Sequence, residues 1–207
     1  MPLQNRVNPF GVITATSERG AWTGNRGVIH NERKEIVRNY AVKYWITCLL
    51  EYKGARRIVM SPKRWTELFF LDEATAFAAG HRPCGFCRHA DFKRFKSLWL
   101  SSNGARYGLT SDTKMAVIDG FIHQERLDSG GFQRTYKAVL SSLPNGTFII
   151  FDELSNPYLW WNNKLYEWSF GGYTEGLAVD LEQEVSVLTP LSYVNVFKAG
   201  YVPQVKF

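Results

Sequence analysis

The pattern of apolar and polar positions divides the chain into strand-like and helix-like stretches. Between residues 10 and 70, β-branched and aromatic residues gather in short runs that are separated by Gly-containing turns. In "KYWITCLLEY" (43–52) the residues alternate, and apolar side chains fall on both faces, as in a central strand. We therefore expect the first third of the chain to be mainly β-structure.

Two later stretches have helical spacing. "DEATAFAAG" (72–80) predicts a short helix that begins with acidic residues and ends at Gly80. In "CRHADFKRFKSLWL" (87–100), aromatic and leucine side chains recur on one face, which predicts an amphipathic helix. A turn that contains two cysteines separates these helices.

The second half repeats this mixture of elements. Residues 111–127 predict a helix capped by Ser111 or Asp112, and 189–200 predict a final short helix. Between them, "TFIIFD", "YLWWNNKLYEW" and "EVSVLT" predict strands, with "WNNK" as a hairpin turn. The fold class is therefore α+β, with a basic, β-rich N-terminal region (1–105), followed by a helix and a small β-rich C-terminal region (106–207). The two regions can also form one compact domain.

The charge is distributed unevenly. The chain carries a net charge of +6, and residues 1–110 hold 18 of the 25 Lys and Arg but only 8 of the 19 Asp and Glu. A basic surface of this kind favours a phosphate-bearing partner, so we expect nucleic acid, in the first place DNA, to bind here. The expected phosphate contacts are Arg56, Arg57, Lys63, Arg64, Arg82, Arg88, Lys93 and Arg94.

Location follows from what the sequence lacks. No run of about 18 apolar residues is present, and residues 1–10 do not have the pattern of a secretory signal. We expect a cytoplasmic protein without a membrane partner, in which the three cysteines are reduced or bind a metal.

The stretch "GHRPCGFCRH" (80–89) concentrates candidate metal ligands. Cys84 and Cys87 have the spacing at which two thiolates from one turn bind the same zinc ion. We expect zinc as the cofactor, with His89 and Cys48 as the candidates that complete the site. The alternative is an element that keeps this shape without a metal.

The longer segment "ELFFLDEATAFAAGHRPCGFCR" (67–88) resembles the second half of the zinc-binding domain of the Ada family of methyl-phosphotriester DNA repair proteins. The resemblance implies a strand, a short helix, a zinc-binding turn with Cys84 and Cys87, and an Arg82 close to DNA. The family's other two zinc ligands are cysteines upstream of the strand, and "RRIVMSPKRWTELFF" (56–70) contains none. The implied function is DNA binding in repair or defence, without methyl transfer by the family's route.

A second hypothesis is an enzyme. Asp119 and His123 are four residues apart on the predicted helix, and Glu125 follows closely. Such a set on one helix face suits a metal-dependent hydrolase or nuclease, although a solvent-facing helix with salt bridges has the same pattern.

A third hypothesis is a non-catalytic interaction module. Aromatic residues are dense in the predicted hairpin 158–168, and an exposed aromatic face there would bind a protein partner. The sequence alone does not decide whether the protein is an enzyme.

Overall fold

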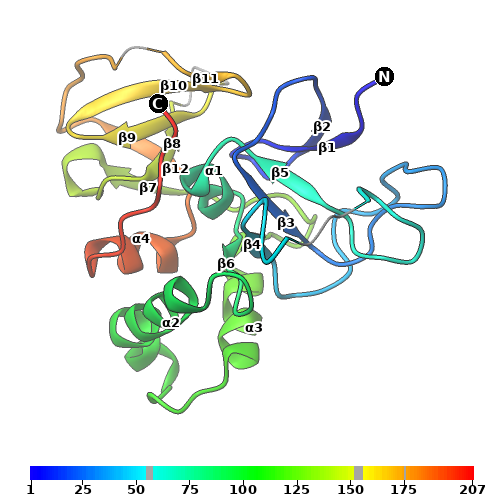
Figure 1. Ribbon diagram of the computed structural model, residues 1–207. Coiled ribbons are helices and arrows are strands. Elements are labelled where there is room, and N and C mark those ends of the chain that lie inside the picture. Colours follow the sequence, from blue (N-terminus) through cyan, green and yellow to red (C-terminus); the bar gives the residue numbers. More distant parts are fainter. Residues whose placement is uncertain (55–57, 152–155, 175) are drawn as a thin grey trace.

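Two β-sheets lie on either side of a short buried helix, α1 (Glu73–Ala78), in the computed structural model (Figure 1). The structure describes residues 1–54, 58–151, 156–174 and 176–207. It is an α+β fold with a β-rich C-terminal region, as the sequence predicts.

The first sheet is built from the N-terminal part of the chain. Its strands in the described residues follow the order β2-β1-β5-β3-β4-β6, with β1 parallel to β5 and β4 parallel to β6. The bounds are β1 (Gln4–Val7), β2 (Ile13–Ala15), β3 (Trp22–Asn25), β4 (Ile46–Cys48), β5 (Leu68–Phe70) and β6 (Arg82–Pro83).

The second sheet is antiparallel, and in the described residues its order is β11-β10-β9-β8-β12-β7. The bounds are β7 (Tyr136–Val139), β8 (Thr147–Ile150), β9 (Tyr158–Trp161), β10 (Lys164–Ser169), β11 (Gly172–Tyr173) and β12 (Glu184–Val187). The β9–β10 hairpin turns at Asn162 and Asn163, both with positive φ, as the "WNNK" pattern predicts.

Helix α1 is short but well defined by its sequence. The Asp72 carboxylate accepts hydrogen bonds from the Thr75 backbone N–H (2.8 Å) and hydroxyl (2.7 Å), which caps the helix. Gly80 has a φ of 80°, so the chain leaves the helix in a left-handed conformation. The sequence predicts both ends of this helix.

The remaining helices form a layer that joins the two halves of the chain. They are α2 (His89–Asn103), α3 (Met115–Arg126) and α4 (Leu191–Lys198). Their shared core contains Phe95 and Trp99 from the first half, and Ile118 and Tyr193 from the second. The boundary expected near residue 105 therefore crosses a common hydrophobic core.

Several predicted elements are shorter than the sequence pattern indicates. Only Ile46–Cys48 of the stretch 43–52 pairs as a strand. Helix α3 begins at Met115 with Lys114 at the N-cap, because residues 110–113 form a turn in which the Thr110 N–H donates to the Thr113 hydroxyl (3.1 Å).

Among the described residues, none of the helices has both the length and the apolar character that a membrane span requires.

A buried ion pair connects the first sheet to α3. The Nε and Nη2 of Arg82 donate hydrogen bonds to the Oδ1 and Oδ2 of Asp119, respectively, each at 2.7 Å. Both side chains are almost completely buried. Loss of one partner would leave the other charge buried and unpaired.

We expect Asp119→Asn to destabilise the fold by about 3 kcal/mol or more, because it leaves the Arg82 charge without its partner. Urea unfolding measures this change, with Asp112→Asn at an exposed position as the control. A loss below about 1 kcal/mol would contradict the role of the pair.

Candidate metal centre

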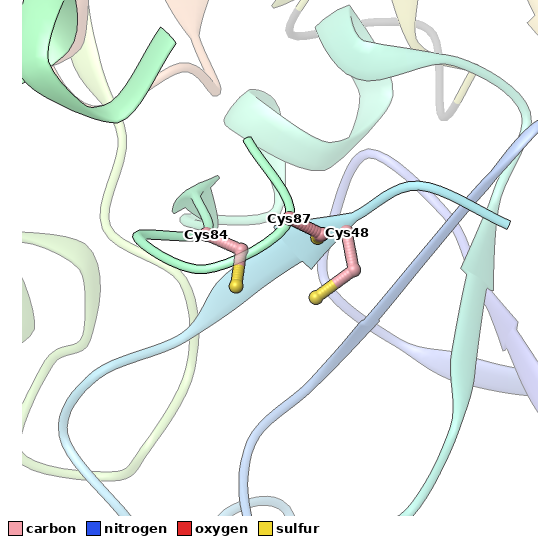
Figure 2. Close-up of side chains that lie close together, drawn as sticks. All are labelled: Cys48, Cys84 and Cys87. Carbon is pink, nitrogen blue, oxygen red and sulfur yellow. The ribbon is translucent and has the colours of Figure 1, made fainter. Parts of the chain in front are cut away.

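Three cysteines from two distant segments of the sequence meet at one edge of the first sheet. Strand β4 ends at Cys48, and β6 pairs parallel to it, with Ile46 opposite Arg82 and Thr47 opposite Pro83. This register brings Cys48 next to the turn that contains Cys84 and Cys87 (Figure 2). The three Sγ atoms all lie within 4.8 Å of one another.

The backbone holds the cysteine turn in place. The Cys84 N–H donates to the Thr47 carbonyl (2.9 Å), and the Arg88 N–H donates to the Cys84 carbonyl (3.1 Å). The Phe86 N–H points at the Cys84 Sγ, at 3.4 Å. An N–H group directed at sulfur stabilises the thiolate form, which is the form that binds a metal.

The thiols differ in their tendency to ionise. A hydrogen bond from Cys48 and the backbone N–H groups of Cys87 and Phe86 lower the pKa of Cys84 to about 5, although burial opposes them. The pKa of Cys87 is also lowered, first by Cys48 and then by the Leu49 N–H. The pKa of Cys48 is raised by its hydrogen bonds to the other two thiols and by burial. The turn thus favours the thiolate form of Cys84 at neutral pH and shifts Cys87 in the same direction.

The cluster lies just below the surface. The exposed fractions of Cys48, Cys84 and Cys87 are 3%, 7% and 7%. Outside them, the ring of the exposed Phe86 packs against Tyr52, with 5.2 Å between ring centroids. The three cysteine side chains are therefore largely shielded from bulk water.

The donor set fits a single thiophilic ion. Zinc binds thiolate sulfur at about 2.3 Å in a tetrahedron, which places the sulfurs about 3.8 Å apart. The cluster therefore needs only a small contraction to surround an ion. Three sulfurs occupy three of the four tetrahedral positions, and the fourth is left for another donor.

His89 does not complete the set. Its Nδ1 lies 3.0 Å from the Gly85 carbonyl oxygen, and the side chain is exposed at the first position of α2. The prediction that Cys48 joins Cys84 and Cys87 agrees with the structure, whereas His89 lies outside their cluster.

The predicted catalytic trio does not converge. Both carboxylate oxygens of Asp119 accept hydrogen bonds from Arg82. The carboxylate of Glu125 accepts hydrogen bonds from the N–H (2.7 Å) and the hydroxyl of Ser192 on α4. The Nδ1 of His123 lies 2.7 Å from the Nη2 of Arg126. Among the described residues, the three cysteines are the one cluster of three or more His, Cys, Asp or Glu close enough to hold an ion. The described residues therefore give no support to a metal site at this trio, and the hydrolase stays a hypothesis.

The predicted phosphate contacts fall into three groups. Arg82 and Arg88 are buried and ion-paired, Arg88 with Glu73 and Asp91, so their guanidinium groups do not reach a phosphate at the surface. Lys63, Arg64, Lys93 and Arg94 are exposed. Arg56 and Arg57 lie outside the described residues.

The aromatic hairpin offers little open surface. Trp160 and Trp168 are buried in the cores of the second sheet. Trp161 and Tyr166 pack against Phe207 at the end of the chain, with centroid distances of 6.0 and 4.8 Å. The expected protein-binding face is thus largely covered by the chain's own C-terminal residues.

The chain matches no protein-family model, no curated protein and no solved structure. A functional conclusion for this chain therefore depends on the geometry of its own residues.

We expect the purified protein to carry about one metal ion per chain and Cys84→Ser to lose it, because two thiolates hold an ion far less tightly than three. Elemental analysis of the untagged protein measures the content. His89→Ala is the matched control and should keep the metal. Metal-free wild-type protein that is folded, or equal content in Cys84→Ser, would refute the site.

Burial, then the positive charges of Arg126 and Lys43, lower the pKa of His123 from 6.5 to about 4. Between these pH values the unfolded chain binds a proton that the folded protein does not, so stability falls as the pH falls from 6.5 to about 4. His81 adds a change of the same sign, since burial lowers its pKa as well.

We therefore expect the free energy of unfolding of His123→Gln to fall less than that of the wild type as the pH is lowered from 6.5 to about 4. Urea unfolding at several pH values measures the slope, and Gln124→Asn at an exposed position is the control. Equal slopes for His123→Gln and wild type would contradict the lowered pKa.

Proposed function

We propose that this protein binds one zinc ion through Cys48, Cys84 and Cys87 and binds nucleic acid, in the first place DNA, through exposed cations of its N-terminal half. The observation that carries the proposal is the convergence of three thiols from two distant segments. In this proposal Cys48 supplies a third ligand beside Cys84 and Cys87, which lie in the segment 67–88 that resembles the Ada family.

Zinc suits these donors better than the other common divalent ions. Soft thiolates favour zinc, copper(I) and iron–sulfur clusters over magnesium, calcium and manganese. Three thiolates also more than neutralise the charge of a zinc ion, which weakens its ability to acidify a bound water. The donor set therefore favours a structural role or chemistry at sulfur over hydrolysis.

A bound zinc would link β4 to the start of α2. Cys87 lies two residues before His89, the first residue of α2, and Cys48 ends β4. An ion between them fixes the direction in which α2 leaves the sheet. Lys93 and Arg94, both exposed in the first half of this helix, would then be held in a defined position.

Exposed cations outnumber exposed acids in the described part of residues 1–110. The cations are Arg19, Arg33, Lys34, Arg38, Lys43, Lys53, Lys63, Arg64, Lys93, Arg94 and Arg106, and the acids are Glu18, Glu32, Glu35 and Glu51. A surplus of this kind attracts a polyanion through phosphate contacts and counterion release.

Two long loops of the first sheet carry many of these cations and are joined to each other by hydrogen bonds. The loop between β3 and β4 is tied to the loop between β4 and β5 through Thr66, whose N–H donates to Gly27 (3.0 Å) and whose hydroxyl bonds His30 (2.6 Å). Lys63 and Arg64 flank a shallow depression that Trp65 also lines. Cations beside an aromatic ring suit a strand with unpaired bases.

We expect the double variant Lys63→Gln, Arg64→Gln to bind DNA about tenfold more weakly at low salt and to reduce the salt dependence of binding, because two phosphate contacts are lost. Fluorescence anisotropy with labelled duplex DNA, single-stranded DNA and RNA over a salt series measures both effects. Lys164→Gln, an exposed lysine of β10, is the matched control.

The absence of salt-dependent binding to all three nucleic acids would overturn the nucleic-acid half of the proposal. Metal content measured on the same samples separates this outcome from failure of the zinc site.

A further inference from the structure

A cavity of about 280 Å³ lies where the two halves of the chain meet. It is surrounded by the β1–β2 hairpin, the loop between β3 and β4, and the C-terminal ends of α1 and α3. Phe10, Ile36 and Leu127 form part of an apolar wall. None of the described residues that line the cavity is Asp or Glu.

Two buried arginines line this cavity. Arg26 is 2% exposed and Arg126 is 3% exposed, yet neither takes part in an ion pair within the described residues. Their partners are neutral: Arg26 donates to the Gly11 carbonyl (2.9 Å) and to the His81 Nε2 (3.2 Å). Arg126 donates to the carbonyls of Gly80 (2.8 Å) and Lys43, and its Nη2 lies 2.7 Å from the His123 Nδ1. Two buried cations without an anion are unfavourable, because burial removes their hydration without a compensating charge.

One aromatic ring lies against both guanidinium groups. The Cζ atoms of Arg26 and Arg126 are 4.0 and 3.7 Å from the ring centroid of Trp45. Cation–π contacts of this kind orient the two groups and offset part of their desolvation. They do not neutralise the two positive charges.

Hydrogen-bonding capacity is left over at the same place. The Nη2 of Arg26 and the Nε of Arg126 are buried donors without a partner. The Oε1 of Gln133, which also lines the cavity, is a buried acceptor without one. Gly11 and Arg26 both line the cavity, and a Cβ built on Gly11 would lie 3.4 Å from the Arg26 Nη2, so a side chain at position 11 would crowd this nitrogen. Buried polar groups are normally hydrogen-bonded, so unpartnered donors indicate a missing acceptor.

Both arginines remain charged at neutral pH. Burial, followed by the charge of Arg126, lowers the pKa of Arg26 to about 9. Burial also lowers the pKa of Arg126 to about 10. An anion that enters the cavity therefore meets two full positive charges.

We propose that this cavity is a binding site for a small organic anion that carries a carboxylate or phosphate group on an apolar body. The Nη2 of Arg26 and the Nε of Arg126, which are the guanidinium donors without a partner, donate to the oxygens of this group. The apolar wall covers the body of the ligand. The site goes beyond the proposed function and shares no residue with the three-cysteine cluster or with Lys63 and Arg64.

The volume favours a molecule with a single ring. Ligand pockets usually measure about 300 to 1,000 Å³, and this cavity, at about 280 Å³, is just below that range. Suitable probes are benzoate for the carboxylate, phenyl phosphate for the phosphate, and inorganic phosphate for the anion without an apolar body.

Isothermal titration of the full chain with each probe in low-chloride buffer tests the proposal. We expect saturable binding of benzoate or phenyl phosphate, and the tighter of the two identifies the group that the site prefers. Arg26→Gln should weaken this binding at least about tenfold, since one of the two charges is removed. Arg19→Gln, an exposed arginine in the same half, is the matched control and should bind as the wild type does.

A second variant keeps the test decisive if Arg26→Gln fails to fold. Asn39 is exposed and lines the cavity, so Asn39→Asp adds a negative charge near the ligand without disturbing the core. We expect it to weaken binding, whereas Asn163→Asp at the distant hairpin turn should not. No saturable binding of either organic anion, or binding that is equal in wild type and Asn39→Asp, would overturn the proposal.

Discussion

The buried helix α1 is the constraint on which the rest of the structure depends. All six of its residues are buried, and its neighbours belong to three separate hydrophobic cores. Phe77 packs in the core of the helical layer, Ala76 in that of the first sheet, and Ala74 and Ala78 in that of the second. Alanine permits this arrangement, because a larger side chain would push one sheet away from the helix. A segment of six residues therefore packs between the two sheets and against the helical layer (Figure 1).

The polar groups around α1 follow from the same burial. Glu73, in the first turn of the helix, is ion-paired with Arg88 and also accepts from the Tyr201 hydroxyl (2.7 Å) and the Gln204 N–H (2.9 Å). Asp72 caps the helix and accepts from the Tyr173 hydroxyl (2.6 Å). These carboxylates tie the C-terminal residues to the first half, and each buried acid has several donors, as burial of a charge requires.

Both candidate sites lie where the chain leaves α1. The turn with Cys84 and Cys87 follows Gly80 within a few residues, and Ala78 and Ala79 line the cavity together with Arg26 and Arg126. A rigid, buried helix thus positions two sites of opposite character. One gathers thiolates that suit a cation, and the other gathers guanidinium groups that suit an anion. Sites supported by such elements keep their geometry better than sites on loops alone.

Local patterns in the sequence determined α1, the asparagine hairpin between β9 and β10, the Cys84–Cys87 turn and the α+β class, because caps, turn residues and side-chain spacing act within a few residues. The sequence also offered Cys48 as a third ligand, but only the parallel register of β4 and β6 decided that it joins the cluster and that His89 does not. Tertiary structure likewise decided that Arg82 and Arg88 are buried beside acids and that Arg26 and Arg126 are buried without them. No local signal distinguishes these arginines from the exposed ones, since burial and pairing depend on segments that meet only when the chain is folded.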